Sequence, residues 1–204
     1  MEEKSTKEKI FDVSLELFSQ KGFSNTSVRE IAKNVGIKES SIYNHYNSKQ
    51  AILDDILDTF TLYFEGDAIG ELELNTLLET NLELFYHQGS QSFRELIKNE
   101  KIMKILRLLF IQMYQDDQLA NYFQKTLLDG PLDFWTMVFT KLMEKKVIKE
   151  GDPRVLARNY YGYTIFLLLE VFIKNNSFPD EELDRIFSEA EEHAISIINS
   201  VRLD

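Results

Sequence analysis

The sequence predicts an all-α protein of about nine helices, and three observations lead to this prediction. Apolar residues recur at helical spacing through most of the chain. No alternation of apolar and polar residues is long enough to indicate a β-strand. The three prolines, Pro131, Pro153 and Pro179, each lie near an expected helix start, where a missing N–H costs nothing. We therefore expect helices joined by short connections.

The expected helices follow one another along the whole chain. The first covers about residues 5–21 and stops at Gly22. A fourth begins near Ser48, and Gly66 and Gly70 mark its end and a linker to the later part of the chain. Later helical patterns cover about residues 72–87, 93–114, 118–128, 131–146, 153–175 and 180–201.

Between the first and fourth helices, residues 27–46 have the spacing of a helix-turn-helix. Ser27, with an acidic residue three positions on, has the form of a capping box and begins the first of the two helices. One apolar stripe follows that helix and comprises Val28, Ile31, Ala32 and Val35. The small Ala32 allows the two helices to cross closely, Gly36 makes the left-handed corner, and Ile42 anchors the second helix.

The second helix of this motif, about residues 38–45, exposes mainly hydrogen-bonding side chains and is therefore expected to contact DNA. Lysine can bind guanine, asparagine can pair with adenine, and serine suits either role. Tyr43, His45 and Lys49 flank the tip and are better placed for phosphate. The predicted DNA contacts are Ser27, Lys38, Glu39, Ser40, Ser41, Tyr43, Asn44, His45 and Lys49. The alternative is an ordinary helical hairpin whose polar face is solvated.

Charge is distributed unevenly along the chain. The formal net charge is -11. Residues 1–50 carry eight Lys and Arg against seven Asp and Glu, whereas residues 51–204 carry fifteen against twenty-seven. Within residues 21–49 the ratio is five basic to two acidic. The basic character is local, which is what binding in a DNA groove requires.

These residues resemble the N-terminal domain of the tetracycline-repressor (TetR) family of transcriptional regulators. The resemblance rests on the runs IAKNVGI and SSIYNHYNSKQAIL, and on Gly22-Phe23 and Thr26-Ser27 before them. It implies a DNA-binding domain over residues 4–64 and a helical effector-binding and dimerisation domain over residues 65–204. Three residues depart from those usual in the family: Ser40, Tyr46 and Asn47. Lys38 and Glu39 lie at positions that vary among its members, so the resemblance does not identify the operator sequence.

The last two helices are expected to form a dimer interface. A single short recognition helix is a weak reader, so helix-turn-helix proteins usually act as dimers. Apolar residues run nearly all the way round these helices, which indicates a second partner. The predicted interface residues are Tyr160, Tyr161, Tyr163, Ala190, Ala194, Ile197 and Ile198. The alternative is a core formed within one chain.

The middle helices are rich in aromatic residues and methionine, which suit a small lipophilic effector. The resemblance implies a pocket among them. Its expected residues are Phe85, Met103, Leu106, Phe110, Met113, Tyr114, Phe123, Trp135, Phe139, Phe166 and Glu170. The same residues could simply form the core. Glu170 could meet a cationic ligand, pair with a partner subunit or face water.

Other classes of protein find little support in the sequence. No cysteine is present, so thiolate metal sites and disulfides are excluded. The three histidines form no Glu-x-x-His pair, and no phosphate-binding loop occurs, so we expect no enzyme, cofactor or metal. Without a leader or a long apolar span, we expect a cytoplasmic protein that does not enter the membrane.

The predicted function is a ligand-responsive repressor that binds a palindromic operator in double-stranded DNA as a homodimer. The alternatives are a helical binding module or a regulator without a small-molecule effector, and a helical-bundle enzyme is the weakest of them.

Overall fold

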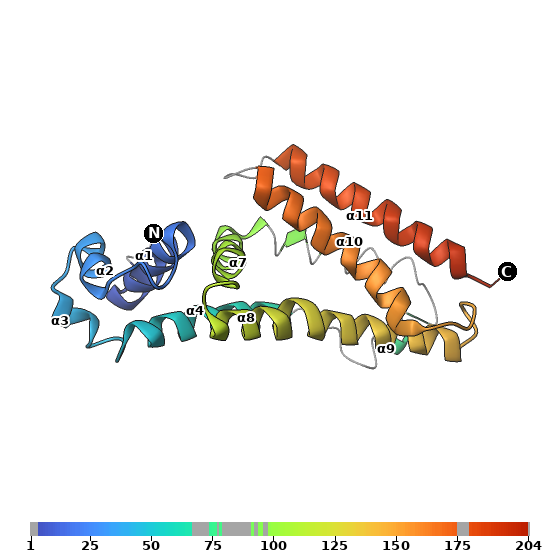
Figure 1. Ribbon diagram of the computed structural model, residues 1–204, viewed down its shortest axis with the longest axis horizontal. Helices are drawn as coiled ribbons and strands as arrows, with labels where there is room; N and C mark the ends of the chain where they lie inside the picture. Colours follow the sequence, from blue (N-terminus) through green and yellow to red (C-terminus); the bar gives the residue numbers. More distant parts are fainter. Residues whose placement is uncertain are drawn as a thin grey trace. The chain divides into compact units, whose positions relative to one another are not determined.

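Figure 1 shows the computed structural model of the chain. It describes residues 4–66, 74–76, 78, 91, 94–95, 98–174 and 180–203. Within these ranges the regular elements are helices, which confirms the all-α prediction. The β-type pairing seen there is an isolated antiparallel bridge between Ile148 and Arg202. None of the described helices is both long enough and apolar enough to cross a membrane.

The contacts divide the chain into two compact units. The N-terminal unit comprises residues 1–69 and 95–123, and the C-terminal unit comprises residues 70–94 and 124–204. The N-terminal unit thus includes a segment, residues 95–123, that lies beyond the DNA-binding domain expected at residues 4–64.

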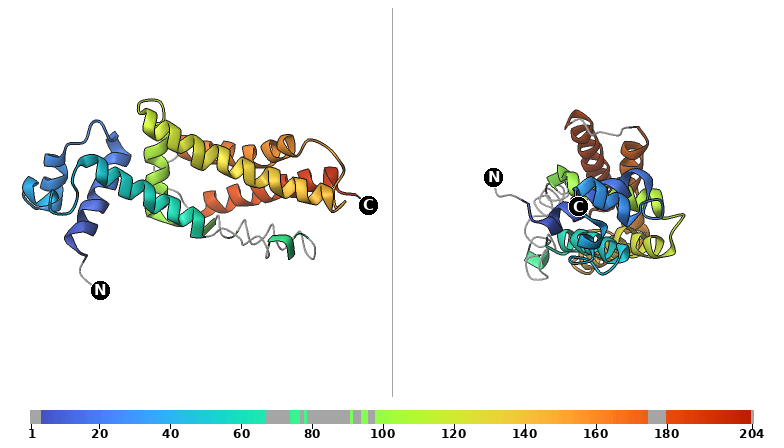
Figure 2. Two further views of the ribbon diagram at one scale, coloured as in Figure 1. Left: turned by 90° about the horizontal axis from the view of Figure 1, so that it is seen from below. Right: turned by 90° about the vertical axis from the view of Figure 1, so that its left-hand side faces the viewer.

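The N-terminal unit is built from six described helices. They are α1 (Thr6–Lys21), α2 (Val28–Val35), α3 (Glu39–Ile42), α4 (Lys49–Gly66), α7 (Glu100–Gln112) and α8 (Asp117–Phe123). Helix α1 contacts α2, α4 and α7. Helix α4 begins beside the turn that follows α3 and leads away from α2 (Figures 1 and 2).

Helix α1 is bounded by residues suited to its two ends. The Ser5 hydroxyl accepts from the Glu8 N–H at 3.3 Å, while the Glu8 carboxylate accepts from the Ser5 N–H at 2.8 Å. This is a complete capping box. The helix ends at Gly22, whose φ of 89° lies in the region that glycine adopts cheaply. Its core face comprises Ile10, Phe11, Leu15 and Phe18.

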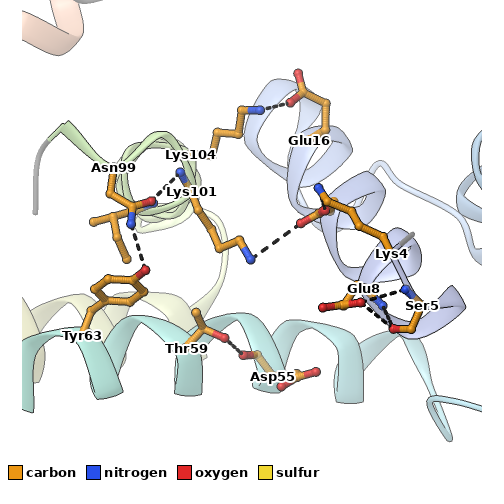
Figure 3. Close-up of polar contacts among 12 residues, drawn as sticks. Lys4, Ser5, Glu8, Glu16, Asp55, Thr59, Tyr63, Asn99, Lys101 and Lys104 are labelled. Carbon is orange, nitrogen blue, oxygen red and sulfur yellow. Dashed lines mark hydrogen bonds and ion pairs between the residues drawn. The ribbon is translucent and has the colours of Figure 1, made fainter. Parts of the chain in front are cut away.

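Two ion pairs link α1 to α7 (Figure 3). Lys104 Nζ lies 2.6 Å from a Glu16 carboxylate oxygen, and Lys101 Nζ lies 3.7 Å from Asp12. These groups are partly exposed, so each pair contributes little by itself. Apolar burial holds the two helices together, because Ile102, Ile105 and Leu109 of α7 have no exposed side-chain surface.

Helix α7 begins later than the predicted start near residue 93. Asn99 is its N-cap: the side-chain oxygen accepts from the Lys101 N–H at 3.0 Å. The Asn99 amide also donates to the Tyr63 hydroxyl of α4 at 2.9 Å, as Figure 3 shows. Asparagine favours the cap position over the helix interior, because its side chain forms hydrogen bonds with nearby backbone groups.

The C-terminal unit contains the π-helical segment η1 (Gln124–Asp129) and helices α9 (Gly130–Glu144), α10 (Pro153–Lys174) and α11 (Asp180–Val201). Helix α10 packs against both α9 and α11. Helices α10 and α11 run side by side in opposite directions in Figure 1. Their starts at Pro153 and Asp180 agree with the sequence prediction.

The predicted helix break before Pro131 is wrong, because η1 leads directly into α9. A proline inside a helix has no N–H for the carbonyl four residues earlier, and its ring crowds that carbonyl. Here the carbonyl in question belongs to Leu127, and it accepts instead from the Tyr161 hydroxyl of α10 at 2.7 Å. The wider π turn and the tyrosine together accommodate Pro131 within a continuous helix.

Candidate nucleic-acid interface

Ser27 is the N-cap of helix α2, as predicted. The Ser27 hydroxyl accepts from the Glu30 N–H at 3.2 Å. The Glu30 carboxylate pairs with Lys21 at the end of α1. The predicted capping box is therefore half formed here, and its acid links α2 to α1.

The turn between α2 and α3 has the predicted left-handed corner. Gly36 has φ 81° and ψ 30°, and its N–H bonds to the Ala32 carbonyl at 3.0 Å. A Cβ at Gly36 would meet nothing within 4 Å. The glycine is therefore needed for its backbone angle and not for space. Ala32 and Ile42 are buried on the two sides of this corner, at 2% and 0% exposure.

Helix α3 is shorter than the predicted range of residues 38–45. Its α-helical part ends at Ile42, and the chain continues in a tighter turn in which the His45 N–H bonds to the Ile42 carbonyl at 2.9 Å. Lys38 is extended, with ψ 146°, and its side chain makes no cap hydrogen bond. Such tightening of a last turn satisfies carbonyls that have no further helix to bond.

Most predicted contact residues are exposed to solvent, and six of the exposed ones lie in or beside α3. Seven of the nine are exposed: Ser27, Lys38, Glu39, Ser40, Tyr43, Asn44 and His45. Ser41 is half-buried. The structure thus combines an anchored Ile42 with hydrogen-bonding side chains turned outward, which is the arrangement that major-groove reading requires.

Lys49, the ninth residue, is engaged with the chain itself. Its Nζ donates to the Phe23 carbonyl at 2.7 Å and to the Thr26 carbonyl at 2.8 Å. It also lies over the Phe23 ring, 4.2 Å from the centroid. The sequence pattern did not predict these bonds, because they join residues more than twenty positions apart.

A second polar cluster, also missed from the sequence, supports the turn after α3. Tyr46 is 5% exposed, and its hydroxyl donates to the Asp55 carboxylate of α4 at 2.6 Å. Lys7 of α1 lies 3.2 Å from the same carboxylate. Burial, followed by the hydrogen bond to Asp55, raises the pKa of Tyr46 above its ordinary value. The available signal was the tyrosine at a position where phenylalanine is usual.

The expected pocket residues are divided between the two units. In the N-terminal unit, Leu106 is buried and Phe110 meets Phe123 edge to face at 5.1 Å. Tyr114 is 88% exposed, which argues against a place in a pocket within one chain. Also in this unit, Met103 is buried and Met113 is half-buried.

In the C-terminal unit, Trp135 lies 4.1 Å from the ring of Tyr160 and packs near Phe139. Phe166 is 55% exposed and Glu170 is half-buried. Phe85 lies outside the described residues. The ring contacts of Phe110 and of Trp135 are the observations that support the proposed effector pocket.

The expected interface residues play several roles within one chain. Tyr160 and Ala194 are buried there, so they can add little area to a dimer. Tyr161 bonds to Leu127, and Tyr163 stacks on His193 at 4.2 Å. Ala190 packs against a cluster of Leu167 and Ile186, while Ile197 and Ile198 are half-buried. The large exposed apolar residues of α10 and α11 include Val155, Phe166, Leu169 and Ile195.

Among the described residues, no group of three or more His, Asp or Glu side chains is placed to hold a metal ion. Tyr46, Asp55 and Lys49 are engaged by contacts within the chain, whereas Lys38, Glu39 and His45 are exposed. The arrangement offers a surface for hydrogen bonding.

Comparison with known proteins shows what this surface is similar to. A family model described as "Bacterial regulatory proteins, tetR family" matches residues 10–56, which span α1 to the middle of α4. The HTH-type transcriptional regulator AcrR of Shigella flexneri is 41% identical over 73 residues, 36% of this chain and 32% of that protein. The negative transcriptional regulator IcaR of the biofilm operon icaADBC, from Staphylococcus aureus strain Newman, is 46% identical over 48 residues, 24% of this chain and 26% of that protein.

One solved structure resembles nearly the whole chain. NalD, the secondary repressor of the MexAB-OprM multidrug efflux pump in Pseudomonas aeruginosa, matches with a TM-score of 0.64 and 19% identity, over 98% of this chain and 96% of that one. At this identity the likeness concerns the fold. The chain spans a third or less of the length of the two sequence relatives. Both relatives are named regulators, in agreement with the expectation that this chain is not an enzyme. The chain is thus similar to the tetR family of bacterial regulatory proteins in sequence over residues 10–56, and to a solved repressor in fold over nearly its whole length.

Proposed function

We propose that the protein is a sequence-specific DNA-binding transcriptional regulator. The observation that carries this proposal is the exposed polar turn of residues 38–45, held by the buried Ile42 behind a left-handed Gly36. A helix of this size fits the major groove, where each base pair presents its own pattern of donors and acceptors. The local excess of basic residues would attract the phosphates.

The exposed side chains divide into two expected roles. Lys38 and Asn44 have the chemistry to pair with guanine and adenine, respectively. Tyr43 and His45, after the last α-helical residue, flank this tip and can donate to phosphate oxygens. Ser27 at the start of α2, and Ser40 and Ser41 in α3, can donate to either. Glu39 can only accept, so an amino group of cytosine or adenine is its favourable partner.

A homodimer on a palindromic operator follows from the size of α3. Its α-helical part is four residues long, so one copy offers few base contacts. Two copies joined by a two-fold axis would engage half-sites about 34–36 Å apart, or a multiple of that distance. The exposed apolar side chains of α10 and α11, Phe166 and Ile195 among them, offer area for such an interface.

A repressor that responds to a small lipophilic molecule is the form of regulation we propose. Occupation of a promoter by a dimer would block transcription. An effector would release the DNA if it bound more tightly to a conformation unfit for the operator. The aromatic group of Trp135, Phe139 and Tyr160 supplies the apolar surface such a molecule needs. A regulator without an effector is the second candidate, because the same rings also pack the core.

The test is a gel shift or fluorescence anisotropy titration with DNA from upstream of the chain's own gene and its neighbours. We expect salt-sensitive binding to one duplex over a scrambled duplex of equal composition. Asn44→Ala should lower the preference, whereas Asn199→Ala, an exposed asparagine of α11, should not. Absence of any sequence preference across these duplexes at low and moderate salt would contradict the proposal.

A further inference from the structure

Lys49, the first residue of α4, holds together the loop that precedes α2. The loop between α1 and α2 runs from Gly22 to Thr26. Its carbonyls accept hydrogen bonds from Thr26 and Lys49. The Thr26 hydroxyl, buried at 1% exposure, donates to the Gly22 carbonyl at 2.9 Å. The Thr26 N–H donates to the Phe23 carbonyl at 3.2 Å. Lys49 completes this set through the Phe23 and Thr26 carbonyls.

The positions of the Phe23 and Thr26 carbonyls show which parts of the chain Lys49 connects. Thr26 directly precedes Ser27, the N-cap of α2. A bond from Lys49 to the Thr26 carbonyl therefore ties the first residue of α4 to the start of α2. The Phe23 ring below the ammonium packs edge to face on Phe18, which is fully buried in α1. Lys49 thus links the start of α4 to the loop that joins α1 and α2.

The chemistry of the ammonium makes it a poor candidate for a phosphate contact. Lysine has three N–H donors, and two are already used on carbonyls of the same chain. A cation placed over an aromatic ring is attracted to that ring as well. Burial lowers the pKa of Lys49 from its ordinary value, as expected for a group withdrawn from water. Rotation toward DNA would break all of these contacts.

We propose that Lys49 is a positioning residue for DNA binding and not a phosphate ligand: it sets the placement of the N-terminus of α2, with Ser27, relative to α4. The inference rests on the proposed function, and it replaces the phosphate role that the sequence pattern predicts for this lysine. A charge used inside the protein binds no phosphate and releases no counterion from DNA.

Salt dependence separates the two roles. A lysine that neutralises a phosphate contributes about 0.9 to the slope of log K against log salt concentration. We expect Lys49→Met to lower operator affinity at least tenfold while the slope stays that of the wild type. Lys38→Met, at an exposed lysine that we assign to a base, is the matched control: it removes the same charge and should relax preference at particular base pairs.

Hydrogen exchange of the DNA-free protein provides a second readout. We expect Lys49→Met to increase amide exchange over residues 23–31, and Lys38→Met to leave those amides unchanged. If Lys49→Met does not fold, Lys49→Gln, which keeps an N–H donor without the charge, is measured in the same two assays. A slope lowered by about 0.9, or unchanged exchange over residues 23–31, overturns the inference. Failure of the proposed function would appear separately, as a wild-type protein without operator preference, and the exchange result would still decide the role of Lys49.

Discussion

Polar side chains in the helix-turn-helix differ in whether the chain already engages them. Lys49 is held by hydrogen bonds to the loop before α2 and Tyr46 by a hydrogen bond to α4, whereas Lys38 and Asn44 are exposed. A side chain with intramolecular partners must give them up before it can bind DNA. The exposed residues are therefore the ones expected to recognise bases.

Replacement of an exposed base reader should alter sequence preference. We expect Asn44→Ala and Lys38→Ala each to relax preference at particular base pairs by about 1–3 kcal/mol if the contact is bidentate. Tyr43→Phe should weaken binding to all duplexes alike, because a phosphate contact carries no sequence information. Competition binding against a panel of operator variants measures both effects. Identical profiles for the three variants would show that this division of roles is wrong.

The burial of Tyr46, together with its hydrogen bond to Asp55, should make stability depend on pH at the alkaline end. The pKa of Tyr46 is raised in the folded protein, so the unfolded chain loses that proton first. The stabilisation is complete below the unfolded pKa of about 10 and is lost as pH rises above it. Tyr46→Phe removes this titration and should cost about 1–3 kcal/mol at neutral pH.

Urea unfolding at several pH values tests this prediction. Between neutral pH and pH values above about 10, the free energy of unfolding should fall more steeply for the wild type than for Tyr46→Phe. Tyr161, whose pKa is also raised by burial, is present in both proteins, so its contribution cancels in the comparison. Parallel curves would mean that Tyr46 does not contribute to the pH dependence.

At the scale of elements, local signals predicted helix ends well where the capping residues lie close in sequence. Ser27, Gly36 and Asp180 all mark boundaries within one turn of their own element. The departures arise where a distant residue decides. Pro131 indicated a helix start because the hydroxyl of Tyr161, thirty residues later, could not be anticipated. Lys49 was assigned to phosphate for the same reason, because its two carbonyl partners precede it by more than twenty residues.

The pairing of Pro131 with Tyr161 can be tested as a double-mutant cycle. Tyr161→Phe leaves the Leu127 carbonyl without its donor, which should cost about 1–3 kcal/mol of stability. Pro131→Ala supplies an N–H to that carbonyl, so Tyr161→Phe should cost less in this background. Chemical unfolding of the four proteins gives the coupling energy. Equal costs in both backgrounds would show that the tyrosine does not compensate for the proline.

At the scale of the whole molecule, self-association is the next requirement of the proposed function. We expect the wild type to be a dimer at micromolar concentration. Phe166→Glu places a charge on the exposed apolar face of α10 and should weaken association at least tenfold, because desolvating an unpaired carboxylate is costly. Met137→Glu, at an exposed residue of α9, is the control and should remain dimeric. Sedimentation velocity over a concentration series measures this. A monomeric wild type, or a fully dimeric Phe166→Glu, would remove α10 from the proposed interface.

The acidic part of the chain, residues 51–204, should affect how strongly the protein binds DNA, because DNA is a polyanion. A net charge of -11 repels phosphate at distances comparable to the Debye length, while the locally basic residues 21–49 still attract it at close range. The acidic part should therefore suppress binding to DNA in general more than binding to the operator. The net charge of the chain would thus raise the ratio of operator affinity to affinity for other DNA.

Four exposed glutamates, Glu144, Glu150, Glu181 and Glu192, allow this to be measured. Changing all four to glutamine alters the formal net charge from -11 to -7. We expect affinity for random duplex DNA to rise several-fold at low salt and the preference for the operator to fall, with both effects shrinking as salt screens the charges. The same four positions changed to aspartate keep the charge and should behave as the wild type. Unaltered affinity for random DNA in the glutamine variant would mean that the acidic charge lies too far from the bound duplex to act on it.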